Sequence, residues 1–200
     1  MMKTFLETSF QNVRSSARTQ ILHQVLLEEV LVAHPEWKDL DWRFEYKLRQ
    51  DGFGGTFDID IAGFEGADMF NTGSLKVAIL AKAINSNVNK NIKNYANTTI
   101  GEAARLCYGR HIQDSLEKVL FISVLPREAP RFNTAGDVVG LDDVLSAKLR
   151  TNVSDVLKEQ YGDKVEVIDR FYTISDVKQK QTKSDFSDII VERLDPMLVA

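Results

Sequence analysis

The sequence predicts a mixed α/β (α+β) fold, in which a mixed central β-sheet is flanked by helices. Apolar residues at three- and four-residue spacing, typical of amphipathic helices, alternate along the chain with short runs that are alternating or continuously apolar, as in strands. The resulting order is α, β, β, β, α, β, α, β, which favours a sheet between helical layers. Since no Pro/Gly-rich linker or internal repeat divides the 200 residues, we expect one domain over 1–200.

Three helices are predicted, over residues 9–34, 91–108 and 141–162. Pro35 follows the first helix and cannot continue it. Gly162 closes the third, because glycine readily adopts the left-handed conformation at helix ends. The apolar stripe of the first helix consists of Leu22, Val25, Leu26, Val30 and Ala33.

Five strands are predicted, and most have the two-residue period of a sheet with one buried face. Residues 118–125 (KVLFISVL) are instead continuously apolar, which is typical of a strand covered on both faces. A turn is expected at 50–55 (QDGFGG), between the first two strands. The five strands are 42–49, 55–64, 75–84, 118–125 and 164–174.

Composition excludes several classes of protein. A net charge of −4 argues against a surface that attracts nucleic acid everywhere, although a local basic groove is compatible with it. Cys107 is the single cysteine, so an intramolecular disulfide and a cysteine-built zinc site are both excluded. No apolar run reaches the ~20 residues of a membrane helix. The start, MMKTFLETSF, lacks the apolar stretch of a secretory signal, and we therefore expect a cytoplasmic protein.

Two aspartates and a lysine on neighbouring strands indicate a metal site. Strict alternation over 55–64 places Asp58 and Asp60 on one face. If this strand pairs with 75–84, Lys82 meets them at one end of the sheet. Adjacent carboxylates repel unless they share a cation or proton, so the pair suits Mg²⁺, and a lysine there can stabilise charge on a phosphate. The opposite face would carry Phe57, Ile59 and Ile61.

A polar segment follows Lys82, with six asparagines within thirteen positions and two lysines among them. Asparagine disfavours helix and strand interiors, so the density indicates a surface that forms hydrogen bonds to phosphates or base edges. Arg105 follows on the helix predicted over 91–108 and is expected to contact the DNA backbone. The other predicted DNA contacts are Asn85, Asn87, Asn89, Lys90, Asn91, Lys93 and Asn94.

These features together resemble the PD-(D/E)xK nuclease superfamily, which includes many restriction endonucleases. The resemblance rests on an acidic residue in one strand, a hairpin, and the next strand ending at Lys82 in VAILAK, within the succession α-β-β-β-α-β. It implies a restriction-endonuclease-like core and a DNA endonuclease that uses Mg²⁺ or Mn²⁺. It also implies that Asp58 and Asp60 bind metal, that Lys82 is catalytic, and that the protein is a homodimer.

One residue departs from the family pattern. Leu80 stands where the family has glutamate or aspartate, so LAK replaces (D/E)xK, and leucine cannot bind a metal. Asp58, Glu29 on the first helix and Glu102 on the next helix are the candidate replacements. If none reaches the site, the chain is a catalytically inactive relative that binds DNA or another protein, or the motif match is accidental.

The remaining site candidates have simpler interpretations. Glu102 lies three residues before Arg105, and the two side chains can pair with each other on one helix face. His23, His34 and His111 lack the spacing of metal ligands, and we expect each to be structural or exposed.

Overall fold

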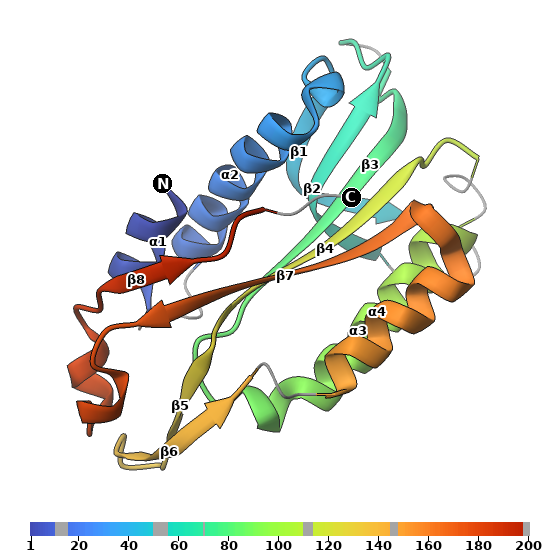
Figure 1. Cartoon of the computed structure of the whole chain (residues 1–200). Coiled ribbons are helices and arrows are strands. Elements are labelled where there is room, and N and C mark those ends of the chain that lie inside the picture. The colour runs from blue at the N-terminus through green and yellow to red at the C-terminus, as the bar shows by residue number, and fades with distance from the viewer. Residues whose placement is uncertain (11–15, 50–55, 70, 110–113, 145–147, 198–200) are drawn as a thin grey trace.

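The protein, described by a computed structural model over residues 1–10, 16–49, 56–69, 71–109, 114–144 and 148–197, contains a mixed six-stranded sheet between helices (Figure 1). The strand order is β1-β2-β3-β4-β7-β8. The predicted fold class is confirmed. The strands are β1 (Asp41–Arg49), β2 (Thr56–Glu65), β3 (Ser74–Ala83), β4 (Lys118–Pro126), β7 (Val165–Ile174) and β8 (Val191–Leu194).

The direction of the strands changes in the middle of the sheet. β1, β2 and β3 form an antiparallel meander, whereas β3, β4 and β7 are parallel, and β8 returns antiparallel to β7. The continuously apolar β4 lies between two parallel neighbours and is buried along its length, as its composition predicts. The crossover from β3 to β4 passes through α3 (Val88–Tyr108).

Helices cover both faces of the sheet. α1 (Met2–Ser9) and α2 (Ser16–Ala33) lie on one face, and α3 and α4 (Lys148–Tyr161) lie on the other (Figure 1). Leu26 of α2 packs with Ile79 in one core, and Leu106 of α3 packs with Leu80 in the second. Within the described ranges, no helix is long and apolar enough to cross a membrane.

The helix predicted over 9–34 corresponds to α2, but Ser9 ends a separate helix, α1. The sequence carried a signal for α1, because the buried residues Met2, Phe5, Leu6 and Ser9 have helical spacing. Residues 11–15 and the turn predicted at 50–55 lie outside the described part of the chain.

The helix predicted over 141–162 is wrong in its first residues. Residues 141–143 belong to β6 (Val138–Asp143), which pairs with β5 (Glu128–Phe132) in a separate two-stranded sheet. Pairing with β5 and burial of the Asp142 side chain fix the strand, and neither is visible in a local hydrophobic pattern. α4 ends at Tyr161 as predicted, and Gly162 has a φ of +60°. Residues 145–147 are not among those described.

The remaining chain contains four short 3₁₀ helices, all at connections between larger elements of the described structure. They are η1 (Pro35–Trp37), η2 (Gly162–Lys164), η3 (Val177–Gln179) and η4 (Lys183–Phe186).

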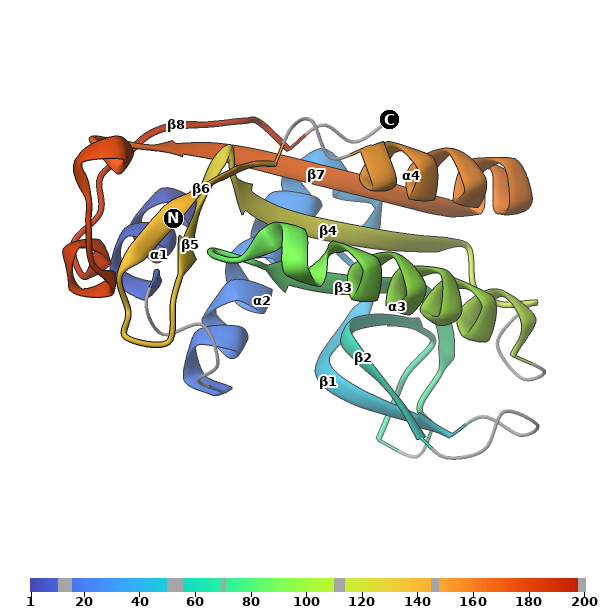
Figure 2. The same cartoon turned by 90° about the horizontal axis from the view of Figure 1, so that it is seen from below.

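The β1–β2 hairpin reverses its faces in the middle, which corrects the strict alternation predicted for 55–64. Ile59 packs with the α3-side core, whereas Ile61, two residues later, packs with the α2-side core. Their partners on β1, Tyr46 and Phe44, are divided in the same way. The hairpin also curls away from the rest of the sheet (Figure 2). The reversal occurs at Asp60, so this residue lies at a distortion rather than within a regular strand.

Candidate metal centre and neighbouring lysine

Asp60 lies in the fork where β2 separates from β3. The two strands pair from Glu65 and Ser74 up to Ile61 and Ile79, and beyond that point β3 pairs only with β4. The Asp60 carboxylate continues the interaction, because its Oδ2 accepts a 2.7 Å hydrogen bond from the backbone N–H of Ala81. The Ala81 N–H therefore holds Oδ2 of Asp60 in place. The other oxygen, Oδ1, faces His23.

Lys82 projects from β3 next to this fork. Its Nζ lies 3.5 Å from Oε2 of Glu102 on α3 and 5.5 Å from the centre of the Tyr95 ring. The Tyr95 hydroxyl accepts a hydrogen bond from Ser123. Ser123 lies on β4, directly opposite Lys82 of β3. The Lys82 side chain is 29% exposed and that of Glu102 is 19% exposed. The Lys82 side chain thus lies between Glu102 and Tyr95 and retains access to solvent.

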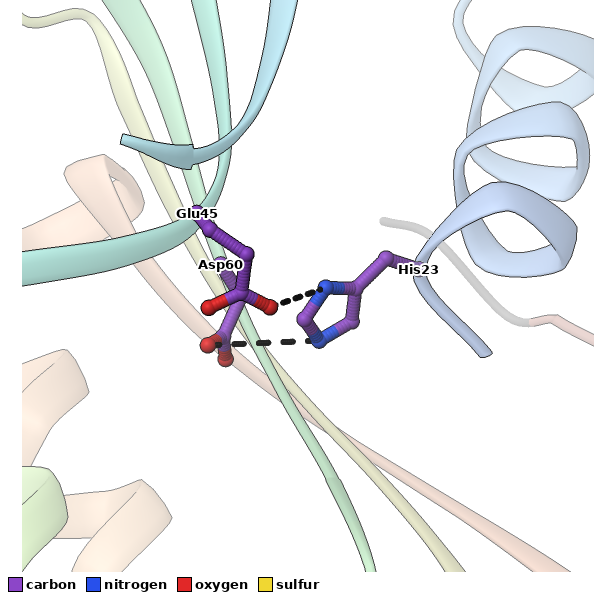
Figure 3. Close-up of side chains that lie close together, drawn as sticks. All are labelled: His23, Glu45 and Asp60. Atoms are coloured by element: carbon purple, nitrogen blue, oxygen red, sulfur yellow. Dashed lines mark ion pairs between the residues drawn. The ribbon is translucent and has the colours of Figure 1, made fainter. Parts of the chain in front are cut away.

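On the α2 side, His23 and Glu45 meet Asp60 (Figure 3). His23 Nδ1 lies 3.0 Å from Oε1 of Glu45, and His23 Nε2 lies 3.9 Å from Oδ1 of Asp60. One ligand atom from each residue falls within 4.8 Å of the others, so the group could hold a metal ion. Among the described residues it is the one such group of three. Its chemistry fits a divalent cation, since two carboxylates and an imidazole supply negative charge and lone pairs.

Burial shapes the electrostatics of both acids. Desolvation raises the pKa of Asp60, while the Ala81 N–H, His23 and Lys82 partly oppose this effect. Desolvation also raises the pKa of Glu102, Lys82 opposes it, and the negative charge of Asp60 adds to it. The charge of Asp60 therefore affects the pKa of Glu102, and the charge of Lys82 affects the pKa of both acids. Acids whose ionised form is disfavoured in this way cluster at functional sites.

The backbone is strained at the same place. Glu45 has a φ of +50°, in the left-handed region that non-glycine residues seldom occupy. It lies opposite Asp60, between the pairs Phe44–Ile61 and Tyr46–Ile59. Such strain persists where surrounding structure imposes it, and it is concentrated at functional sites. Here it accompanies the reversal of faces that brings Glu45 and Asp60 to the His23 side of the sheet.

The structure separates the predicted replacements for the acid missing at Leu80. Glu102 is beside Lys82, whereas Glu29 forms an ion pair with the buried Arg170 and lines a cavity of about 520 Å³ with Val25 and Val32. Asp58 is exposed opposite Lys47 and does not belong to the His23–Glu45–Asp60 group. Leu80 itself is 3% exposed, within the α3-side core.

Asn85 is not a surface residue, which corrects its predicted DNA contact. It is fully buried, its amide donates a hydrogen bond to the Phe10 carbonyl, and its Oδ1 accepts one from the Tyr172 hydroxyl. Asn87 is half-buried, and its Oδ1 accepts a hydrogen bond from the backbone N–H of Phe132 on β5. These first two asparagines of the polar segment connect β3 to its neighbours, a role that composition alone does not reveal.

The buried position of Asn85 leads to a stability prediction. Asn85→Ala would leave the Tyr172 hydroxyl and the Phe10 carbonyl without these partners in a buried region, and should lower the free energy of unfolding by about 1–3 kcal/mol. Urea unfolding followed by circular dichroism would measure the change. Asn94→Ala, at an exposed position of α3, is the control and should change it by less than about 0.5 kcal/mol. Equal effects of the two substitutions would contradict the structural role.

The other predicted DNA contacts lie on α3. Asn89 and Asn94 are exposed, and the Asn89 N–H donates to Asp142. The Arg105 guanidinium lies 5.1 Å from the centre of the Phe57 ring, and its positive charge slightly opposes the rise in the pKa of Glu102 that burial causes. The side chains of Lys90, Asn91 and Lys93 are outside the described part of the structure.

Sequence reasoning missed two members of the metal group. A hairpin that pairs Arg49 with Thr56 necessarily brings Glu45 opposite Asp60, so the register held a usable signal for Glu45. His23 gave a weaker signal, since it adjoins Leu22 in the apolar stripe of α2 and looks like a core residue. Its role depends on how α2 packs across the sheet.

Comparison with known proteins identifies no relative: no family model, no curated protein and no solved structure matches this chain.

Proposed function

We propose that the protein is a metal-dependent DNA endonuclease of the restriction-endonuclease-like type, which hydrolyses phosphodiester bonds. The observation that carries this proposal is the position of Lys82, next to Asp60 at the fork between β2 and β3 and 3.5 Å from Glu102. The charges of Lys82, Asp60 and Glu102 influence one another, and burial raises the pKa of both acids, a combination that is common at functional sites.

Each residue has a distinct role in this proposal. Asp60 and Glu45 hold a divalent cation, Mg²⁺ or Mn²⁺, which would polarise the phosphate and lower the pKa of bound water. Lys82 places positive charge beside the phosphate and stabilises the negative charge that develops on it. Glu102 orients the Lys82 ammonium and replaces, from α3, the carboxylate that Leu80 cannot supply on β3.

DNA would approach along α3, which begins just after the fork. Its exposed asparagines, Asn89 and Asn94, offer hydrogen bonds to phosphates or base edges, and Lys90, Lys93 and Arg105 add positive charge along the same helix. Cleavage of both strands needs two sites, so we also propose a homodimer, which sedimentation of the free protein and of its DNA complex would test.

A catalytically inactive DNA-binding relative is the alternative. Leu80 favours it, because the position that carries an acid in the family is here part of the hydrophobic core. Such a protein would bind DNA without cutting it, and binding would weaken when Lys90 or Lys93 is changed.

Plasmid cleavage tests the enzyme against this alternative. We expect nicking or linearisation of supercoiled DNA with Mg²⁺ or Mn²⁺ and none with EDTA. Lys82→Met should reduce the rate about a hundredfold, since it removes one charge that stabilises the transition state. Lys76→Met is the matched control, because Lys76 lies on the same strand but pairs with Glu65 and Glu117, and it should cut normally. Metal-dependent cleavage that survives Lys82→Met, or binding without cleavage in the wild type, would overturn the proposal.

A further inference from the structure

His23 is a buried histidine whose ring nitrogens lack ordinary partners. The side chain is 0% exposed, and neither nitrogen forms a hydrogen bond with acceptable geometry in the described part of the chain. The 3.0 Å contact of Nδ1 with Glu45 is close, but it is not directed as a hydrogen bond requires. Buried polar atoms are nearly always satisfied, and leaving one unsatisfied costs about 1–3 kcal/mol. The unsatisfied ring nitrogens therefore indicate that His23 binds a ligand such as a metal ion.

The spacing around His23 matches a shared cation. Nε2 lies 3.9 Å from Oδ1 of Asp60, which exceeds the ~3.2 Å limit of a good hydrogen bond. Two ligands that each lie about 2.1 Å from one ion are separated by at most about 4.2 Å, so this gap can be bridged by a metal. Oδ2 of Asp60 is already occupied by the Ala81 N–H, which leaves Oδ1 as the oxygen available to the His23 side.

We propose that His23 is a direct metal ligand, and that the His23–Glu45–Asp60 group consequently prefers first-row transition ions such as Co²⁺ and Mn²⁺ over Mg²⁺. This inference rests on the metal site of the proposed function but not on DNA cleavage. Mg²⁺ demands oxygen ligands in octahedral geometry and retains its waters, so an imidazole contributes little to its binding. Transition ions accept imidazole nitrogen readily and gain from it increasingly along the series from Mn²⁺ to Cu²⁺.

The preference is measured by isothermal titration of the metal-free full chain with CoCl₂, MnCl₂ and MgCl₂. We expect Co²⁺ to bind at least about a hundredfold more tightly than Mg²⁺, and His23→Asn to narrow this ratio about tenfold or more by weakening Co²⁺ alone. His34→Asn is the matched control, because His34 follows the same helix but pairs with Glu36, and it should leave the ratio unchanged. An unchanged ratio in a folded His23→Asn protein would overturn the inference.

A second measurement needs no substitution at the buried position. In wild-type protein with ¹⁵N-labelled histidine, Co²⁺ should shift or broaden the ring-nitrogen signals of His23 selectively among the three histidines. Signals of His23 that stay unmoved at saturating Co²⁺ would overturn direct ligation. If cleavage with Mg²⁺ occurs while His23 is unaffected by Co²⁺, the nuclease stands and this inference fails. If His23 ligates Co²⁺ but no metal supports cleavage, the inference stands and the nuclease fails.

Discussion

Asp60→Asn is expected to reduce cleavage at least about a thousandfold and to raise the melting temperature of the metal-free protein by about 2 °C. Cleavage is lost because the amide cannot replace a carboxylate as a metal ligand. Stability rises because burial disfavours the ionised carboxylate, as the raised pKa of Asp60 shows. The amide introduced by the substitution keeps an oxygen that can accept the Ala81 N–H, so the fork between β2 and β3 is preserved.

The sign of the pH dependence follows from the same shift. Asp60 has a higher pKa in the folded than in the unfolded protein, so its ionisation destabilises the fold at neutral pH. As the pH falls through the folded-state pKa towards the unfolded value, Asp60 takes up a proton and this destabilisation disappears. The stability gain of Asp60→Asn should therefore be present at pH 7 and vanish near pH 3, which is about one unit below the ordinary pKa of an aspartate.

Thermal melts in EDTA at both pH values, beside plasmid cleavage with metal, measure this prediction. Asp58→Asn is the control, because Asp58 is exposed two residues away and outside the metal group, and it should keep cleavage. A lower melting temperature for Asp60→Asn at pH 7 would contradict the electrostatic account. Cleavage lost in Asp58→Asn would show that the sequence-based assignment of Asp58 as a ligand was right.

Glu102→Gln is expected to reduce cleavage by up to about a hundredfold, as Lys82→Met does, with little loss of stability. Glu29→Gln should instead lower the stability and leave cleavage per folded molecule unchanged. Glu102 contacts the Lys82 ammonium, and burial raises the pKa of Glu102, so we expect neutralising this side chain to cost little stability. Glu29 pairs with Arg170, which is 4% exposed, while Glu29 itself is 29% exposed and Arg170 also donates to the Asp195 carbonyl. Loss of the charge on Glu29 should therefore cost about 1–3 kcal/mol. The pair of substitutions thus decides which helix supplies the missing acid.

Cleavage per folded molecule and urea unfolding would be measured for both variants. Normal cleavage by Glu102→Gln would remove Glu102 from the site and leave Leu80 without a replacement, which favours the inactive relative. Loss of cleavage by a fully folded Glu29→Gln protein would instead indicate that Glu29, on α2, replaces the acid missing at Leu80.

The elements that sequence reasoning placed well are those whose signal is local. β4 is continuously apolar, and the ends at Pro35 and Gly162 follow from backbone chemistry. α2 buries Leu22, Val25, Leu26 and Val30 of its predicted stripe, although Ala33 is exposed. β5 and β6 escaped prediction because they are stabilised by pairing with each other and by buried polar contacts of Asp142. A single-strand pattern carries no information about such partners.

The sequence by itself determined the mixed sheet between helices and the nearness of Asp60 and Lys82, because strand order and the short β2–β3 connection bring their residues to one end of the sheet. Only the tertiary structure decided which residues surround them. Glu102 reaches Lys82 through the packing of α3, and His23 reaches Asp60 through the packing of α2. The register already places Glu45 opposite Asp60, but both turn towards His23 because the hairpin reverses its faces at a left-handed residue. A two-residue pattern cannot show such a reversal.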